Sequence, residues 1–103
     1  MNVQECQLQR INYCNQILQH EYTQYINMQT QKDNELTIRD WFIFYKNLIL
    51  AKLRIKEYLV LQQELLEQIL HNNKHIKVRY DQIGEIQDDD TIISLFAIVL
   101  DFQ

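Results

Sequence analysis

The stretch Thr37–Asn72, TIRDWFIFYKNLILAKLRIKEYLVLQQELLEQILHN, decides the fold of this 103-residue chain. Its apolar residues recur at steps of three and four, the spacing of a helix face. Thr37 followed by Asp40 resembles a capping box, in which the Thr37 hydroxyl accepts a hydrogen bond from the Asp40 amide. Asn72 and Asn73 mark the end, because asparagine tolerates a left-handed helix cap. The stretch predicts one helix of roughly 35 residues and roughly 50 Å.

This predicted helix carries two apolar stripes. At 100° per residue, the wider stripe contains Trp41, Phe44, Leu48, Ala51, Ile55, Tyr58, Leu59, Leu66 and Ile69. A narrower stripe, about 120° away around the helix, contains Phe42, Ile49, Leu53 and Val60. Packing against a single neighbour needs only one stripe, so this helix is expected to pack on two sides. Its second stripe must meet the C-terminal segment, another copy of the chain or a different protein.

Residues 3–29 predict a first helix that precedes the long one. Its apolar residues form one stripe, while the opposite side is rich in glutamine; the stripe contains Leu8, Ile11, Cys14, Leu18, Tyr22 and Tyr25. A polar break at residues 30–34 separates the two helices, and Asp33 and Asn34 compete with Thr37 as the cap of the second. Two long antiparallel helices, about 3–29 and 37–72, are therefore expected.

The last thirty residues change character. Ile76, Val78 and Tyr80 alternate with charged residues, which is typical of a half-buried strand. Gly84 and residues 87–90 predict a turn, and residues 91–102 are apolar and rich in β-branched side chains. A C-terminal β-hairpin of residues 76–83 and 91–102 is favoured; the alternative is a short buried third helix capped by Asp90. The expected fold class is α+β, mainly α, with residues 1–103 as a single domain.

Composition excludes several classes of enzyme. The chain has one glycine and no proline, whereas phosphate-cradling loops, dinucleotide-binding turns and nucleophile elbows need glycine at set positions. Glu67, His71 and His75 are spaced like ligands on one helix face, but the predicted helix end at Asn72–Asn73 separates the two histidines. We expect no catalytic residues, no metal site and no cofactor.

The N-terminus lacks the apolar core of a signal peptide, and residues 41–61 hold too many charges for a membrane span. Cys6 and Cys14 lie about 12 Å apart along a helix, too far for a disulfide within it. Both cysteines are expected to be small buried residues with free thiols. The protein is expected in the cytoplasm or another reducing intracellular compartment, and no membrane partner is expected.

Charge is unevenly distributed. Residues 1–38 carry −2, residues 39–79 carry +4 and residues 80–103 carry −6. The acidic residues Asp88, Asp89 and Asp90 suggest a docking surface for a basic partner, as on small acidic inhibitors and immunity proteins, an analogy of size and charge only. The basic stretch 46–79 suggests the alternative of a nucleic-acid-associated regulator.

The leading hypothesis is a non-enzymatic protein-interaction protein, either a small assembly subunit or an acidic inhibitor. A protein partner or a homo-oligomer is expected to cover the apolar residues that two helices of unequal length leave uncovered. The predicted partner-binding residues are Trp41, Phe42, Ile49, Leu53, Val60, Asp88, Asp89 and Asp90.

Overall fold

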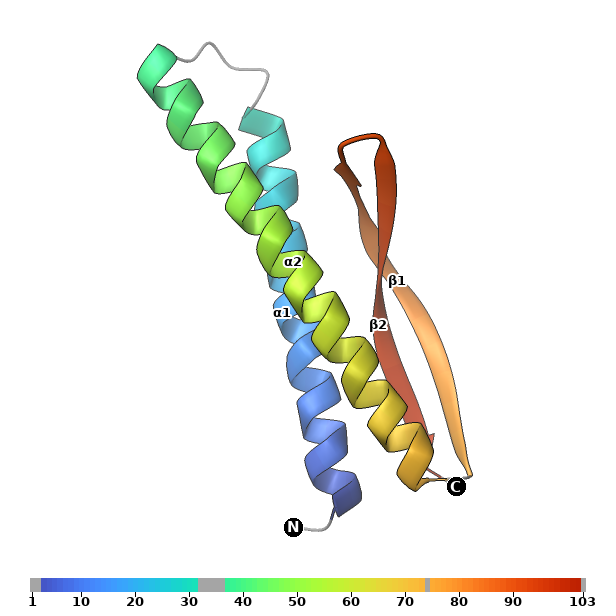
Figure 1. Ribbon diagram of the computed structural model, residues 1–103. Helices are drawn as coiled ribbons and strands as arrows, with labels where there is room; N and C mark the ends of the chain where they lie inside the picture. Colours follow the sequence, from blue (N-terminus) through green and yellow to red (C-terminus); the bar gives the residue numbers. More distant parts are fainter. Residues whose placement is uncertain (1–2, 32–36, 74, 103) are drawn as a thin grey trace.

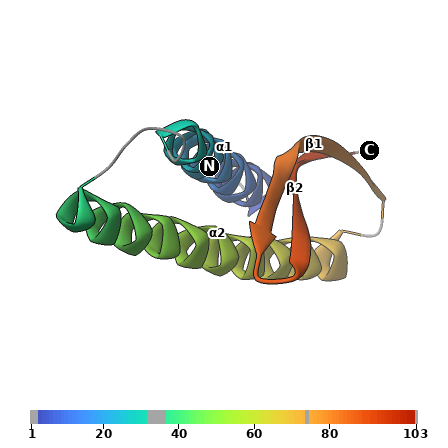
Figure 2. The ribbon, with the colours of Figure 1, turned by 90° about the horizontal axis from the view of Figure 1, so that it is seen from above.

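The computed structural model describes residues 3–31, 37–73 and 75–102. Two long helices, α1 (Val3–Gln31) and α2 (Ile38–Asn72), are followed by an antiparallel hairpin of β1 (Ile76–Asp88) and β2 (Thr91–Phe102). The helices run antiparallel, and the hairpin lies along them (Figure 1). Seen from above, α1 and the end of the hairpin near the C-terminus lie on the same side of α2, while the hairpin turn crosses over α2 in this view (Figure 2). The expected fold class is confirmed, and residues 91–102 form a strand rather than a third helix.

Both ends of α2 are held by specific hydrogen bonds. The Asp40 amide donates to the Thr37 Oγ1 at 3.2 Å, so the predicted cap is confirmed. The competing caps, Asp33 and Asn34, lie outside the described residues. At the other end, Asn73 is extended, with φ −132°, rather than left-handed as predicted. Its amide and its side-chain Nδ2 both donate to the Ile69 carbonyl, which satisfies a free helix-end acceptor without a left-handed residue.

The core consists of two apolar clusters stacked along the helices. The first joins the middle of the helices to the tip of the hairpin, and contains Leu18, Tyr25, Phe44, Leu48, Ile55, Ile86 and Leu95. The second joins the opposite end of the helices to the base of the hairpin, and contains Ile11, Leu66, Ile69, Ile98 and Leu100. The α1 stripe and most of the wider α2 stripe are therefore buried. Among the described residues, no helix is apolar enough over sufficient length to cross a membrane.

The hairpin turn is tighter than predicted. It comprises only Asp89 and Asp90, and Asp89 adopts φ 54°, which aspartate tolerates better than most residues. Gly84 lies within β1, at a register shift between Gln82 and Gly84, and is not part of the turn. A methyl group at Gly84 would overlap the ring of Tyr22 on α1. Glycine is needed here because the strand backbone lies directly against that ring.

Two polar side chains hold the outer edge of β2 against the helices. Asn15 on α1 donates to the Ile98 carbonyl at 2.8 Å and accepts from the Ile98 amide at 3.0 Å, as a neighbouring strand would. Gln62 on α2 is buried and donates to Asn15 at 3.0 Å and to the Phe96 carbonyl at 2.9 Å. The edge of β2 is thereby satisfied where it packs on the helices.

Candidate protein-interaction surface

One face of α2 is apolar and uncovered. We define the outer face as Ile38, Phe42, Ile49, Leu53 and Val60, whose exposed fractions are 79%, 66%, 56%, 49% and 59%. On the opposite side of the same helix, the exposed fractions of Leu48 and Ile55 are 7% and 0%. Four of the five outer-face residues are the predicted narrow stripe, to which the structure adds Ile38.

The positions of α1 and the hairpin explain why this face is open. Arg54 of α2 donates from Nε to Glu21 of α1 at 3.1 Å. Lys56, on another side of α2, pairs with Asp88 at the end of β1. These two pairs mark the flanks of α2 that α1 and the hairpin occupy. The outer face lies on the part of α2 between these two flanks, where its side chains remain exposed.

The outer face has a nearly straight course along α2. Ile38, Ile49 and Val60 are spaced by eleven residues, and so are Phe42 and Leu53. Eleven residues in three turns correspond to about 3.67 residues per turn, close to the 3.6 of an ordinary helix. The stripe therefore extends for about 33 Å without winding away to another side.

Aromatic side chains gather at the N-terminal end of this face. The ring centroids of Trp41 and Tyr45 are 4.1 Å apart, and those of Trp41 and Phe42 are 5.8 Å apart. Trp41 belongs to the wider predicted stripe, yet it remains 48% exposed. The helices extend past the hairpin turn here (Figure 1), so no strand covers this end. Large, rigid aromatic side chains of this kind are common anchors in protein interfaces.

The three acidic residues at the tip of the hairpin have different surroundings. Asp88 is half-buried and pairs with Lys56, while Asp89 and Asp90 are exposed in the turn. The adjacent Gln87 amide donates to the Tyr25 hydroxyl at 3.2 Å. Of the three predicted acidic residues, one therefore stabilises the docking of the hairpin and two present negative charge to solvent.

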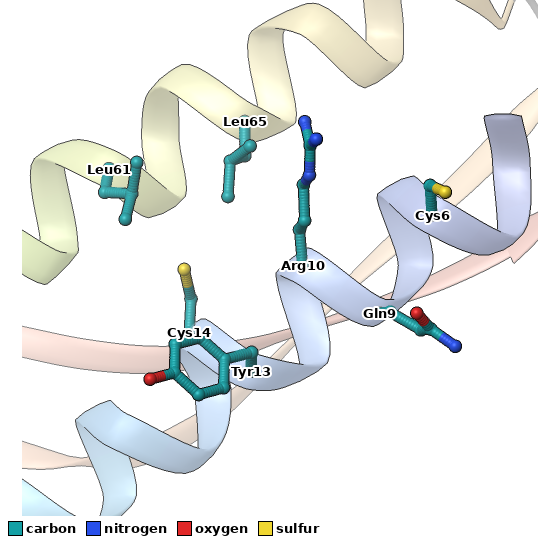
Figure 3. A pocket seen from close by; sticks show the side chains of 7 residues that line it. All are labelled: Cys6, Gln9, Arg10, Tyr13, Cys14, Leu61 and Leu65. Atoms are coloured by element: carbon teal, nitrogen blue, oxygen red, sulfur yellow. The ribbon is translucent and has the colours of Figure 1, made fainter.

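The structure also reveals a groove that the sequence did not predict. It lies between α1 and α2 and has a volume of about 610 Å³. Its lining residues are shown in Figure 3: Cys6, Gln9, Arg10, Tyr13 and Cys14 from α1, and Leu61 and Leu65 from α2. Cys6, Arg10 and Tyr13 have helical spacing, but only tertiary packing brings them to Leu61 and Leu65. Burial raises the pKa of the Cys14 thiol, which favours its protonated form over the more nucleophilic thiolate.

The basic residues and histidines considered in the sequence analysis lie as follows. Arg54 and Lys56 pair with carboxylates, and the pKa of Arg79 is raised by its hydrogen bonds to Asp81. His71 lies in the last turn of α2 and His75 follows the helix. Within residues 3–31, 37–73 and 75–102, no group of three or more histidine, cysteine or acidic side chains could hold a metal ion.

The surfaces described above rest on this chain's own geometry. Comparison with protein-family models, with curated proteins and with solved structures found no match for the chain.

Proposed function

We propose that this protein is a non-enzymatic protein-interaction module, a small subunit of an assembly or an inhibitor that occludes its partner. The observation that carries the proposal is the outer face of α2, where five large apolar side chains are about half exposed or more. Exposed apolar side chains are ordinary when scattered, but a contiguous stripe on one helix is typical of an interaction site.

The size of the hydrophobic effect supports this interpretation. Complete burial of one large aliphatic or aromatic side chain is worth about 1.5–3 kcal/mol. Covering the exposed parts of the five outer-face residues therefore recovers on the order of 5–9 kcal/mol. Association itself costs about 4–15 kcal/mol in lost freedom. The outer face supplies a large part of what a stable complex needs, and the aromatic end supplies anchors for the remainder.

The hairpin tip supports the inhibitor version of this proposal. Asp89 and Asp90 are exposed beside each other, and the chain carries a formal charge of −4. Negative charge at the edge of an apolar interface accelerates encounter with a basic partner and adds little to the final affinity. The alternative of a nucleic-acid-associated regulator has less support, because three basic residues of the stretch 46–79, namely Arg54, Lys56 and Arg79, are paired with carboxylates of the same chain.

The test is quantitative co-purification of the tagged chain from its native cells. The variant Phe42→Gln/Leu53→Gln keeps residues compatible with a helix but removes two apolar contacts from the outer face. Ile92→Thr is the matched control, because Ile92 is equally exposed but lies on the hairpin. We expect the double variant to lose proteins that the wild type and the control retain. Identical recovery with all three chains would contradict a role for this face.

A second comparison separates the subunit from the inhibitor. Asp89→Asn/Asp90→Asn removes the exposed charge at the tip and leaves the outer face intact. If the protein is an acidic inhibitor, this variant associates more slowly with the recovered partner, and the difference from wild type shrinks at high salt. Unchanged association rates at low salt would favour the assembly subunit.

A further inference from the structure

We infer that the partner on the outer face is a second copy of this chain, with α2 packed antiparallel against α2. The inference rests on the proposed function, since it takes the outer face to be a binding surface. It goes further by identifying the occupant and the register of the contact.

The charge of α2 favours an antiparallel copy. Residues 38–56 contain five basic side chains and one acidic side chain, whereas residues 57–72 contain three acidic side chains and neither lysine nor arginine. In an antiparallel pair, the basic half of each helix lies along the acidic half of the other. A parallel pair would place like charges together along the whole contact, which is unfavourable.

The apolar residues fix a register for this pair. We place a two-fold axis perpendicular to the two helices, at the level of residues 51 and 52. This axis brings Phe42 against Val60 of the second copy. The same axis places Ile49 against Leu53 of the second copy. The symmetry repeats both contacts, so four pairs of outer-face side chains meet in one self-complementary interface.

The charged residues beside the outer face match in that same register. Arg39, Lys46, Glu57 and Glu64 lie within about 20° of one another around the helix. In a two-fold antiparallel pair, equivalent flanks of the two helices meet, so Lys46 lies opposite Glu57 of the second copy. By the same operation, Arg39 lies opposite Glu64 of the second copy. All four are exposed, and none forms an ion pair with a residue that the structure describes.

The positive charges on the other flank are compatible with the pair. Lys56 borders the outer face, but its charge is balanced by Asp88 of its own chain. Lys52 lies closest to the proposed axis; it is half-buried and lines the same hollow as Asp89 of the hairpin. Both lysines are thus turned toward the acidic tip of their own hairpin.

The outer face supplies part of the contact area. A stripe about 33 Å long on a helix about 10 Å wide covers roughly 300 Å² in outline. The largest apolar patch on a typical soluble monomer is about 300–600 Å² and is often functional. A standard stable interface buries about 800 Å² on each partner, so residues beside the stripe, including the flanking charged residues, must contribute the rest of the contact.

Sedimentation equilibrium of the purified full chain tests the inference. We expect a monomer–dimer equilibrium for the wild type. Glu57→Lys/Glu64→Lys makes the whole flank positive and should raise the dimer dissociation constant at least about tenfold. The fourfold exchange Arg39→Glu/Lys46→Glu/Glu57→Lys/Glu64→Lys restores opposite charges and should recover dimerisation. Because all four residues are exposed, a loss of folding is not expected, and circular dichroism checks this.

Cysteine cross-linking tests the direction and register. A chain with Phe42→Cys mixed with a chain carrying Val60→Cys should form a disulfide-linked pair on mild oxidation. Phe42→Cys alone should not, because two-fold antiparallel packing separates the two copies of that position by about 27 Å along the helix. The wild type treated in the same way measures any contribution of Cys6 and Cys14.

Two kinds of result would overturn the inference. Cross-linking of Phe42→Cys to itself would indicate parallel packing. A wild-type chain that stays monomeric at the highest concentration reached would exclude the dimer. If native proteins are nevertheless lost from the Phe42→Gln/Leu53→Gln variant, the proposed function stands with a different partner; if nothing depends on that variant, the proposed function fails as well.

Discussion

The two sides of α2 differ in their surroundings far more than in their composition. Leu48 and Ile55 on the covered side are buried, while Ile49 and Leu53, one and two residues away in sequence, are about half exposed. The same residue types occur on both sides. What distinguishes them is that α1 and the hairpin together cover only part of the circumference of α2 and leave the outer face exposed. Apolar patterning therefore predicts which residues seek cover, and the neighbours available within the chain decide which of them obtain it.

The largest expected effect is the difference in stability between matched isoleucine variants on the two sides of α2. Ile55→Ala leaves a cavity in the core and should lower the free energy of unfolding by about 2–5 kcal/mol. Ile49→Ala on the outer face should lower it by less than about 1 kcal/mol when the chain is dilute. Urea denaturation of both variants measures the difference. Equal losses at low concentration would mean that the outer face is buried within a single chain.

The second prediction concerns the clamp that keeps the hairpin on the covered side. Asn15→Ala removes three hydrogen bonds, and leaves the Ile98 amide and carbonyl without their partner in a partly buried position. The expected loss is about 2–3 kcal/mol, with faster hydrogen exchange along β2. Asn12→Ala is the control, because Asn12 is exposed on the same helix. Equal stability of the two variants would show that the clamp contributes nothing.

The third prediction concerns the close approach of the hairpin to α1. Gly84→Ala should cost about 1–3 kcal/mol, because the new methyl group overlaps the Tyr22 ring and the strand must shift. Tyr22→Ala removes that ring and should make the Gly84→Ala change nearly neutral. A double-mutant cycle by thermal or urea denaturation measures the coupling. Additive effects would mean that Tyr22 does not restrict position 84.

The smallest effect is a pH dependence within the helix pair. Because burial raises the pKa of Cys14, the folded chain keeps this thiol protonated at pH values where the unfolded chain releases the proton. Stability is therefore complete below the ordinary thiol pKa of about 8.5 and falls as pH rises above it.

Cys14→Ala removes this contribution, so its stability should fall less steeply with pH than that of the wild type. Urea denaturation at a series of alkaline pH values compares the two slopes. Parallel slopes would show that Cys14 does not titrate differently in the two states.

Local signals account for most of what was predicted correctly. The cap at Thr37, the end of α2 at Asn72 and the alternation at Ile76–Tyr80 depend on residues close in sequence, so one-dimensional patterns reveal them. The prediction that Gly84 lies in the hairpin turn was wrong; it was made because glycine often indicates a turn. Here it is needed for contact with Tyr22, 62 positions away, which no local pattern reports. The clamp formed by Asn15 and Gln62 was missed for the same reason.

The candidate surface was only partly predictable. The narrow stripe from Phe42 to Val60 follows from helical periodicity alone, and its exposure agrees with the expectation that the chain cannot cover both stripes. The groove at Cys6, Tyr13 and Leu61 was not predicted, since its two walls come from different helices. The different roles of Asp88 and of Asp89 and Asp90 were not predictable either. Asp88 is paired because the hairpin packs with its tip beside Lys56, which is a tertiary contact.

The sequence by itself determined the elements and the excess of apolar surface, because hydrogen bonding within a helix and side-chain periodicity are local properties. It also determined the bipolar charge of α2, which is a matter of order along the chain. Only the tertiary structure decided which stripe is covered, since that depends on where a hairpin joined by long-range contacts comes to rest. Its position beside Asn15, Tyr22 and Lys56 leaves the outer face of α2 open.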